Sequence, residues 1–409
     1  MEPKIRFNNN SWQKHKVGEL CDLLTGYPFP GDKILNRGKN LLMRGINITE
    51  GRIRHSDEID RYYNEDTIGL EKYRLQVGDL VISMDGSKVG KNSALVTSKE
   101  NYSLLVQRVA RLRNEDKNLI NLIQIAVGSD KFIKYVEEMK TSSAIPHISP
   151  ADIRNFPLSL PEDSNERRLV ASYFTSLDSQ ISASTSRLAS LKQMKAASLQ
   201  AMFPQEGETV PKIRFKGFEG EWRTCPLYHF AKKRTEKNTK MLYNITLTNS
   251  AEFGIIDQRN FFDHEISNSE NINGYYVVRD HDFVYNPRIS SSAPVGPINQ
   301  NKLGYTGVMS PLYLVFEING INRDFLEIFF HTTLWHKYMF DNGNTGARFD
   351  RLAISDEDFM KMPIPDIDFG EQQAIASYFT SLDRQISLQS QRLEKLKQIK
   401  SACLDKMFV

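Results

Sequence analysis

The chain has 409 residues, 40% of them hydrophobic and 25% charged, and its formal net charge is only +3. This composition is ordinary for a soluble globular protein, and no apolar run approaches the ~18 residues that a membrane-spanning helix needs. Three isolated cysteines without a CxxC pair exclude a disulfide framework, and the start of the chain lacks the apolar core of a secretory signal. We therefore expect a cytoplasmic protein with reduced thiols and no membrane partner.

From its first residues the chain is built as a tandem repeat. Pro3-Lys-Ile-Arg-Phe7 returns as Pro211-Lys-Ile-Arg-Phe215, and a tryptophan follows each copy. Between the copies lies a polar stretch with proline and glycine, which is typical of a linker. We predict two similar units, each with a large first part and a helical second part. The predicted segments are residues 1–162, 163–203, 204–210 (the linker), 211–368 and 369–409.

The first part of each unit mixes strands and helices. Short β-branched runs at Leu80-Val-Ile-Ser-Met84 and Leu312-Tyr-Leu-Val-Phe316 predict strands, and helical patterns lie near residues 117–140 and 322–340. The two first parts share little literal sequence, but they share landmarks. These are an aspartate before a strand (Asp79 and Asp282) and a later glycine (Gly90 and Gly296). We predict one α/β fold that carries two divergent sets of loops.

The second part of each unit predicts one long helix, because it lacks proline and glycine before its end. Its apolar residues recur with the spacing of a heptad seam. In the first copy they are Val170, Phe174, Leu177, Ile181, Leu188 and Leu191, and the second copy repeats them 205 positions later. A stripe of that length needs an apolar partner. We therefore predict an α+β protein whose two long helices form an antiparallel coiled coil with pseudo-twofold symmetry.

Signatures of enzymes are incomplete throughout the chain. Asn286-Pro287-Arg288 lacks the second proline and the aromatic residue with which adenine methyltransferases grip a flipped base. The run from Gly86 to Asn92 is one residue short of a phosphate-binding loop, and His331 and His336 have no carboxylate partner for a zinc site. We expect no catalytic residue, no metal site and no bound cofactor in this chain.

Two sets of loops are instead rich in hydrogen-bond donors. Arginine pairs with guanine edges and asparagine with adenine, while lysine and serine bind phosphates. Each cluster alone is equally typical of a polar turn, but clusters recur at corresponding places in both copies, which favours DNA binding. The candidate residues are Arg44, Asn47, Ser87, Lys88, Lys91 and Asn92 in the first unit, and Asn286, Arg288, Ser290, Ser291 and Arg348 in the second.

The start of each long helix resembles a known family. Glu166-Arg-Arg-Leu-Val-Ala-Ser-Tyr-Phe-Thr-Ser-Leu-Asp178 and its copy from Glu371 to Asp383 are similar to a segment of the specificity subunits of Type I restriction–modification systems. The runs at Asp79 and Asp282 also resemble the recognition domains of that family, and the resemblance covers essentially the whole chain. One departure is Arg167-Arg168, where the second copy has Gln372-Gln373, which leaves the local subunit contact undetermined.

The resemblance implies a subunit without chemistry of its own. Each first part would be a target recognition domain that reads one half of a split, asymmetric site in double-stranded DNA, and the coiled coil would space the two domains. Two modification subunits would methylate adenine with S-adenosylmethionine. Restriction subunits would use ATP and Mg²⁺ for translocation and cleavage.

Eight residues from Ala171 to Asp178 recur unbroken, and several of them lie off the apolar seam. A recent duplication would explain this identity, and so would a docking surface for two copies of one modification subunit. On the second interpretation the contact residues are Tyr173, Thr175, Asp178, Tyr378, Thr380 and Asp383. Two other functions stay open: the DNA-reading region of a different restriction system, and a tandem-repeat scaffold that binds only proteins. The sequence does not determine the DNA target, the spacer length or whether the system also restricts.

Overall fold

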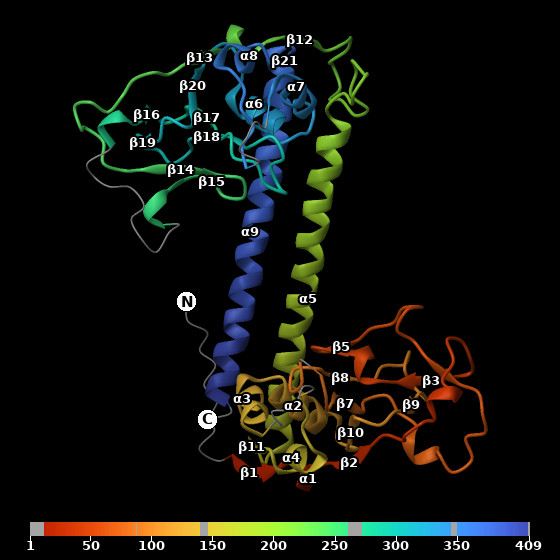
Figure 1. The fold of residues 1–409 in the computed structure, drawn as a ribbon. Helices are drawn as coiled ribbons and strands as arrows, with labels where there is room; N and C mark the ends of the chain where they lie inside the picture. The colour runs from red at the N-terminus through yellow and green to blue at the C-terminus, as the bar shows by residue number, and fades with distance from the viewer. Residues whose placement is uncertain (1–11, 87, 140–145, 261–271, 345–349, 408–409) are drawn as a thin grey trace. The chain divides into compact units, whose positions relative to one another are not determined.

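The computed structural model describes residues 12–86, 88–139, 146–260, 272–344 and 350–407 (Figure 1). The chain divides into two compact units. Unit 1 comprises residues 1–186 and 391–409, and unit 2 comprises residues 187–390. Both long helices, α5 (Ser164–Ala201) and α9 (Phe369–Met407), therefore contribute one part to each unit.

Unit 1 is built on a four-stranded antiparallel sheet with the order β2-β10-β7-β8. These strands are Asp22–Thr25, Val109–Arg113, Leu80–Ser83 and Ser93–Leu95. The smaller strands are β1 (Gln13–Lys16), β3 (Asn40–Met43), β4 (Ile48–Thr49), β5 (Arg52–Ile53), β6 (Tyr62–Tyr63), β9 (Leu104–Leu105) and β11 (Pro157–Leu160). Besides α5, the helices are α1 (Val17–Leu20), α2 (Lys117–Val127), α3 (Asp130–Met139) and α4 (Pro150–Asn155), with short 3₁₀ turns at Gly31–Lys33, Gly45–Asn47 and Glu71–Tyr73.

Unit 2 repeats this arrangement with the order β13-β20-β17-β18. These strands are Ala231–Lys233, Leu314–Ile318, Phe283–Tyr285 and Ile298–Gln300. The other strands are β12 (Arg223–Pro226), β14 (Leu247–Ser250), β15 (Gly254–Asp257), β16 (Tyr276–Val278), β19 (Gly307–Met309) and β21 (Pro363–Asp366). The helices besides α9 are α6 (Arg323–Phe330), α7 (His336–Asn342) and α8 (Asp356–Met360), with 3₁₀ turns at Leu227–His229, Gln258–Asn260 and Ile272–Gly274. The predicted fold, two β-rich units with a long helix after each, is confirmed.

The structure refines two details of the prediction. The helical patterns near residues 117–140 and 322–340 are helical in the structure, and each is divided into two helices. In unit 1 the break comes at Gly128, and the hydroxyl of Ser129 donates to Ala126 O and accepts from Phe132 N, which caps the next helix. The predicted strand at residue 312 begins only at Leu314, because Leu312 N donates to the hydroxyl of Ser310 in a turn.

The repeated aspartates organise the turn before the central strand of each sheet. Asp79 is buried; its carboxylate accepts a backbone N–H from Gln76 at 2.7 Å and two bonds from Arg113 at 2.6 and 2.7 Å. Asp282 accepts in the same way from Arg279 N at 2.7 Å and from Arg234 at 2.7 and 2.9 Å. A buried carboxylate is tolerated when it is paired and hydrogen-bonded in this way. The landmark aspartates are thus structural.

The start of each long helix is bound both to a distant part of the chain and to the segment just before it. Glu166 accepts from the indole of Trp12 at 2.9 Å, whereas Glu371 accepts two bonds from Arg214, both at 2.7 Å. Arg167 and Gln372 hold the same position in the two copies, and each makes a bond to the backbone. The Arg167 guanidinium donates to Pro161 O at 3.1 Å, and the Gln372 amide donates to Ile367 O at 2.9 Å. Different side chains therefore bind a carbonyl just before the helix in both units.

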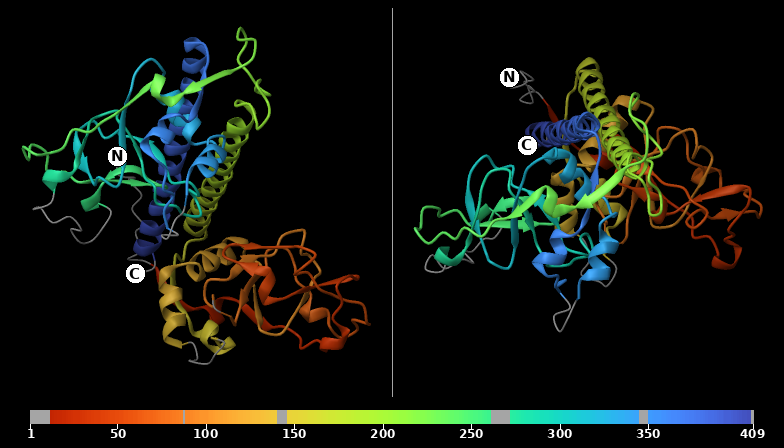
Figure 2. Two further views of the ribbon diagram at one scale, coloured as in Figure 1. Left: turned by 45° about the horizontal axis from the view of Figure 1, so that its top comes forward. Right: turned by 90° about the horizontal axis from the view of Figure 1, so that it is seen from above.

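Within each unit, the parts of α5 and α9 that belong to it contact each other and run antiparallel (Figures 1 and 2). In unit 1 the Lys400 ammonium donates to Asp178 at 2.6 Å, and the hydroxyl of Tyr173 lies 3.7 Å from Cys403 Sγ. In unit 2 Lys195 donates to Asp383 at 2.6 Å, and Tyr378 Oη lies 2.9 Å from Ser198 Oγ. Each residue in the unit 2 contacts is 205 positions from its counterpart in the unit 1 contacts, so the two sets of contacts are equivalent. The predicted antiparallel pairing is confirmed in each unit.

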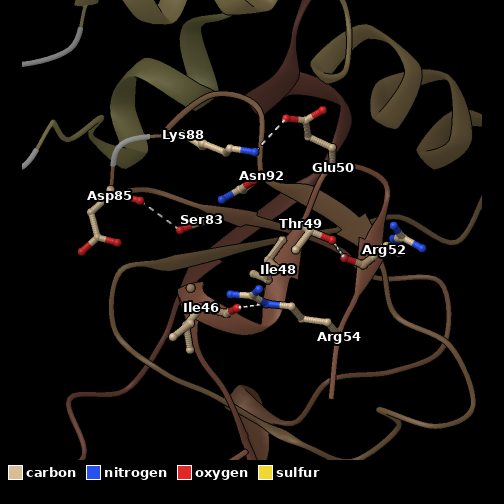
Figure 3. Close-up of a pocket in the computed structure, with 12 residues that line it drawn as sticks. Ile46, Ile48, Thr49, Glu50, Arg52, Arg54, Ser83, Asp85, Lys88 and Asn92 are labelled. Carbon is tan, nitrogen blue, oxygen red and sulfur yellow. Dashed lines mark hydrogen bonds and ion pairs between the residues drawn. The ribbon is translucent and has the colours of Figure 1, made fainter. Parts of the chain in front are cut away.

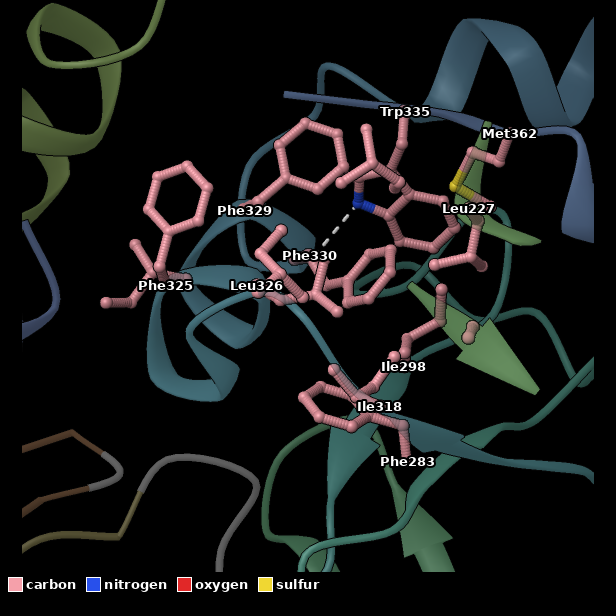
Figure 4. Packing of buried hydrophobic residues seen from close by; sticks show 14 of the residues in the cluster. Leu227, Phe283, Ile298, Ile318, Phe325, Leu326, Phe329, Phe330, Trp335 and Met362 are labelled. Carbon is pink, nitrogen blue, oxygen red and sulfur yellow. Dashed lines mark hydrogen bonds between the residues drawn. The ribbon is translucent and has the colours of Figure 1, made fainter. Parts of the chain in front are cut away.

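The core of unit 2 is aromatic. Phe325, Phe329 and Phe330 of α6 pack with Trp335, whose indole N–H donates to Phe330 O at 3.0 Å (Figure 4). The segment just after α5 joins this core, because the ring of Phe203 stacks on Phe325 with centroids 5.9 Å apart. Across the parts of the chain that the structure describes, no helix has the length and apolar character needed to cross a membrane.

Candidate nucleic-acid interface

A polar groove of about 630 Å³ opens in unit 1 where strand β7 ends (Figure 3). The β4–β5 hairpin forms one wall, and the loop between β7 and β8 forms the other. Its lining residues are Gly45, Ile46, Ile48, Thr49, Glu50, Arg52, Arg54, Ser83, Asp85, Gly86, Lys88 and Asn92. The lining includes positive side chains (Arg52, Arg54 and Lys88) and negative ones (Glu50 and Asp85), so the groove suits a polar ligand with both donors and acceptors.

Hydrogen bonds within the chain hold the hairpin side of this groove. Arg54 Nε donates to Ile46 O at 2.9 Å, and the hydroxyl of Thr49 donates to Arg52 O at 2.8 Å. Across the mouth, Lys88 Nζ lies 3.8 Å from a carboxylate oxygen of Glu50. These interactions preorganise the hairpin while leaving the amino group of Lys88 mostly exposed.

Only some of the predicted residues of the first unit line the groove. Lys88 and Asn92 line the groove, and Lys91 is exposed beside it but outside its lining. Asn47 is fully buried: its amide donates to Asp60 at 2.9 Å and accepts from Arg44 N at 3.3 Å. It therefore organises the loop, and a base contact would require the loop to open. Ser87 lies outside the described residues.

Arg44 is also half-buried and does not line the groove. Its guanidinium lies 3.5 Å from Ile59 O. Burial, followed by repulsion from Arg61, lowers the pKa of Arg44 from its ordinary value. The side chain stays charged, because arginine titrates far above neutral pH, but its position makes it a weaker candidate than Lys88.

A second groove, of about 390 Å³, opens in unit 2 where strand β17 ends. The β14–β15 hairpin and the segment after β17 line it. Its polar lining residues include Thr248, Asn249, Ser250, Gln258, Asn286, Arg288, Ser290, Tyr313 and Arg351. The loops after β7 and β17 hold equivalent places in the two sheets, and each faces a hairpin. The same groove therefore occurs twice, with different side chains.

In the second unit, too, only some of the predicted residues are exposed in the groove. Arg288 and Ser290 are exposed in the groove. The Asn286 amide donates to Asn249 O at 2.9 Å and accepts from Arg288 N at 3.0 Å, so it shapes the loop. Ser291 is exposed but does not line the groove, and Arg348 lies outside the described residues.

Several lining residues were missed by sequence reasoning. Arg52 and Arg54 come from a hairpin far from the glycine-rich loop that they face, and Arg351 and Gln258 come from segments distant from Arg288. The available signal in unit 1 was Gly51, which has φ +77° and marks a tight turn between two short strands. Position along the chain alone could not place these residues opposite the loops.

The six predicted subunit-contact residues lie along the helix pair. Tyr173, Asp178, Tyr378 and Asp383 have the partners within the chain described above, and the Thr175 hydroxyl donates to Ala171 O at 2.9 Å. Thr380 is exposed. The tyrosine and the aspartate of the repeated octamer therefore have a structural role that the sequence did not reveal, because each makes an equivalent contact with the other long helix in both units. Contact with another subunit stays a prediction.

Within the described ranges no group of three or more histidine, cysteine or acidic side chains could hold a metal ion. Residues 9–193 match the family model described as "Type I restriction modification DNA specificity domain".

This part of the chain is thus similar to the specificity subunits of Type I restriction–modification systems.

Similar proteins agree with this family. A curated relative, the Type I restriction enzyme EcoAI specificity subunit of Escherichia coli, is 30% identical over 161 residues, which are 38% of this chain and 27% of that protein. The crystal structure of a Type I S subunit from M. genitalium has a TM-score of 0.60 and 14% identity, and the match covers 100% of this chain and 99% of that one. A structure described for the assembly of a Type I system has a TM-score of 0.50, 17% identity and 98% coverage of both chains. The specificity-subunit fold thus extends over both units.

Proposed function

We propose that this chain is the non-catalytic, DNA-reading subunit of a Type I restriction–modification complex. Its two grooves would each read one half of a split, asymmetric target in double-stranded DNA. The observation that carries the proposal is the recurrence of one groove at the same place in two similar folds with different linings. A duplicated fold explains two grooves, and different linings explain why the halves of the target would differ.

The lining chemistry supports base reading rather than catalysis. Arginine and lysine in the first groove match guanine edges and phosphates, and its carboxylates match the cytosine amino group. The second groove is lined by two arginines together with side chains that carry hydroxyl and amide groups. Because the net charge is only +3, the chain alone would bind DNA weakly, and partner subunits would supply further phosphate contacts.

The proposed partners are two modification subunits and, through them, restriction subunits. S-adenosylmethionine would then be bound by the modification subunits, and ATP and Mg²⁺ by the restriction subunits. The antiparallel helix pair supports a count of two, because it offers the same side chains 205 positions apart in each unit. A surface that occurs twice suits two copies of one partner.

Salt dependence tests DNA binding. We expect the complex with its modification subunits to bind duplex DNA at least tenfold more weakly in about 200 mM salt than in about 50 mM salt, because phosphate contacts release counterions. Fluorescence anisotropy with a labelled random duplex measures this. Binding that does not change with salt concentration, or no binding at all, would favour a scaffold that binds only proteins.

Alanine variants should separate the half-sites. Arg288→Ala should weaken reading of one half by about 1–3 kcal/mol if the arginine contacts guanine, and Lys88→Ala should act on the other half. Selection of bound sequences from a randomised duplex library measures each half separately. Arg279→Ala, an exposed arginine outside the groove lining, is the control. Unchanged selection by both groove variants would contradict their assignment.

A charge swap tests the role of the repeated aspartates. Asp178→Lys with Asp383→Lys should abolish methylation if a modification subunit binds these carboxylates. Because Lys400 and Lys195 also lose their partners, a second variant adds Lys400→Asp and Lys195→Asp. Exposed pairs of this kind contribute about 1 kcal/mol or less, so both variants should fold. Methylation restored by the swap would show an intramolecular role, whereas persistent loss would support docking.

A further inference from the structure

Two arginines of the second groove converge on one carboxylate. Arg288 and Arg351 lie opposite each other in an isolated antiparallel bridge. The backbone bonds from Ile289 N to Asp350 O, at 3.0 Å, and from Leu352 N to Pro287 O, at 2.9 Å, hold the two segments together. Asp350 Oδ2 lies 3.7 Å from Arg288 Nη2 and 3.8 Å from Arg351 Nε. One negative charge is thus shared by two positive charges.

The contact between Asp350 and the two arginines is weak enough for a phosphate to replace the carboxylate. Both distances exceed those of a charge-assisted hydrogen bond, which is about 2.7–2.9 Å, and the side chains of Arg288 and Asp350 are 66% and 53% exposed. An exposed ion pair contributes little free energy, so a phosphate oxygen with better geometry can displace the carboxylate. Displacement leaves Asp350 beside DNA, where its charge opposes binding unless a base donates a hydrogen bond to it.

We propose that Asp350 is a specificity-determining residue that holds Arg288 and Arg351 in the free subunit and, on the correct target, accepts a hydrogen bond from a cytosine amino group. Carboxylates accept from cytosine N4 in the major groove. On other sequences the carboxylate finds no donor, and its repulsion from phosphates lowers affinity. This inference rests on the proposed DNA-reading function and names the base class that the second groove reads.

A similar contact occurs independently in unit 1. Glu50 lies 3.8 Å from Lys88 across the mouth of the first groove, and both side chains are more than half exposed. Lys88 and Arg288 stand in equivalent loops, but Glu50 comes from the β4–β5 hairpin, whereas Asp350 lies between α7 and α8. A loosely held basic side chain beside an exposed carboxylate is therefore a property of both grooves rather than of one loop.

The test compares Asp350→Asn with a matched control in the complex with its modification subunits. Asp350→Asn should bind a random duplex up to about fivefold more tightly, the factor that corresponds to about 1 kcal/mol. Its salt slope should steepen by about 1 to 2, because one or two more phosphates are contacted. Selection from a randomised library should lose a cytosine preference at one position, by about five- to 150-fold.

Two further variants keep the test decisive. Glu236→Gln removes the same charge and releases Arg279, whose guanidinium lies 2.7 Å from Glu236 outside the groove lining; it should leave the selected sequence unchanged. Asp350→Glu should retain the cytosine preference in part. The inference is overturned if Asp350→Asn keeps the wild-type preference, or if Glu236→Gln reproduces its effects. Failure of the wild-type complex to bind DNA would instead count against the proposed function.

Discussion

Replacing Phe174 by alanine should destabilise unit 1 by about 3–5 kcal/mol, the usual cost of removing a buried phenylalanine side chain. Phe174 is fully buried in the core of unit 1, where α5 meets the end of α9 and the side chain of Met407. Truncation would leave a cavity among the buried residues of this core. Phe379 is its counterpart in the core of unit 2 and should behave alike.

Urea unfolding followed by circular dichroism and tryptophan fluorescence measures this effect. Because the chain has two units, the transition is fitted unit by unit rather than as one step. Leu169→Ala is the control, since this side chain is 62% exposed on the same helix and should cost well under about 1 kcal/mol. A Phe174→Ala protein within about 1 kcal/mol of wild type would contradict the described packing.

Deleting one heptad from both long helices should shorten the spacer of the DNA target and leave both half-sites intact. Residues 183–189 of α5 and 388–394 of α9 are matching segments, 205 positions apart, near the boundary between the units. Seven residues correspond to about 10 Å of helix, and that length corresponds to about three base pairs of duplex. Removing a whole heptad preserves the apolar seam and the contacts of Asp178 and Asp383.

Sequencing of methylated DNA reports the spacer and both half-sites together. Deleting the heptad from only one helix is the control, because it breaks the register of the pair and should cost stability rather than reset the spacer. If the paired deletion changed base identity in a half-site, the helices would not act as a ruler.

The regular parts of this molecule could be predicted because the sequence repeats them. The seam through Phe174 and Leu177 has helical period and no breaker, and the length of the stripe requires an apolar partner. The breaks at Gly128 and before Trp335 were harder to predict, because apolar residues continue on both sides and local capping decides where each helix ends.

The grooves could be predicted only in part, for a different reason. Lys88 and Arg288 stand in glycine- or serine-rich loops, which have a local signal. Arg351 and Arg54 reach the same grooves from distant segments, and only the sheet topology brings them there. Asn47 and Asn286 show the opposite limit: a polar side chain in a loop has the composition of a binding residue whether it points to a ligand or bonds to its own backbone.

The central claim is that this chain directs methylation to a split, asymmetric DNA sequence. Methylome sequencing of cells that express it with its modification subunit tests this most directly, with cells that express the modification subunit alone as the control. We predict N6-methyladenine in one bipartite motif whose two halves differ and are separated by unread bases, and none in the control. Methylation of a continuous or palindromic motif, or the same methylation without this chain, would contradict the claim.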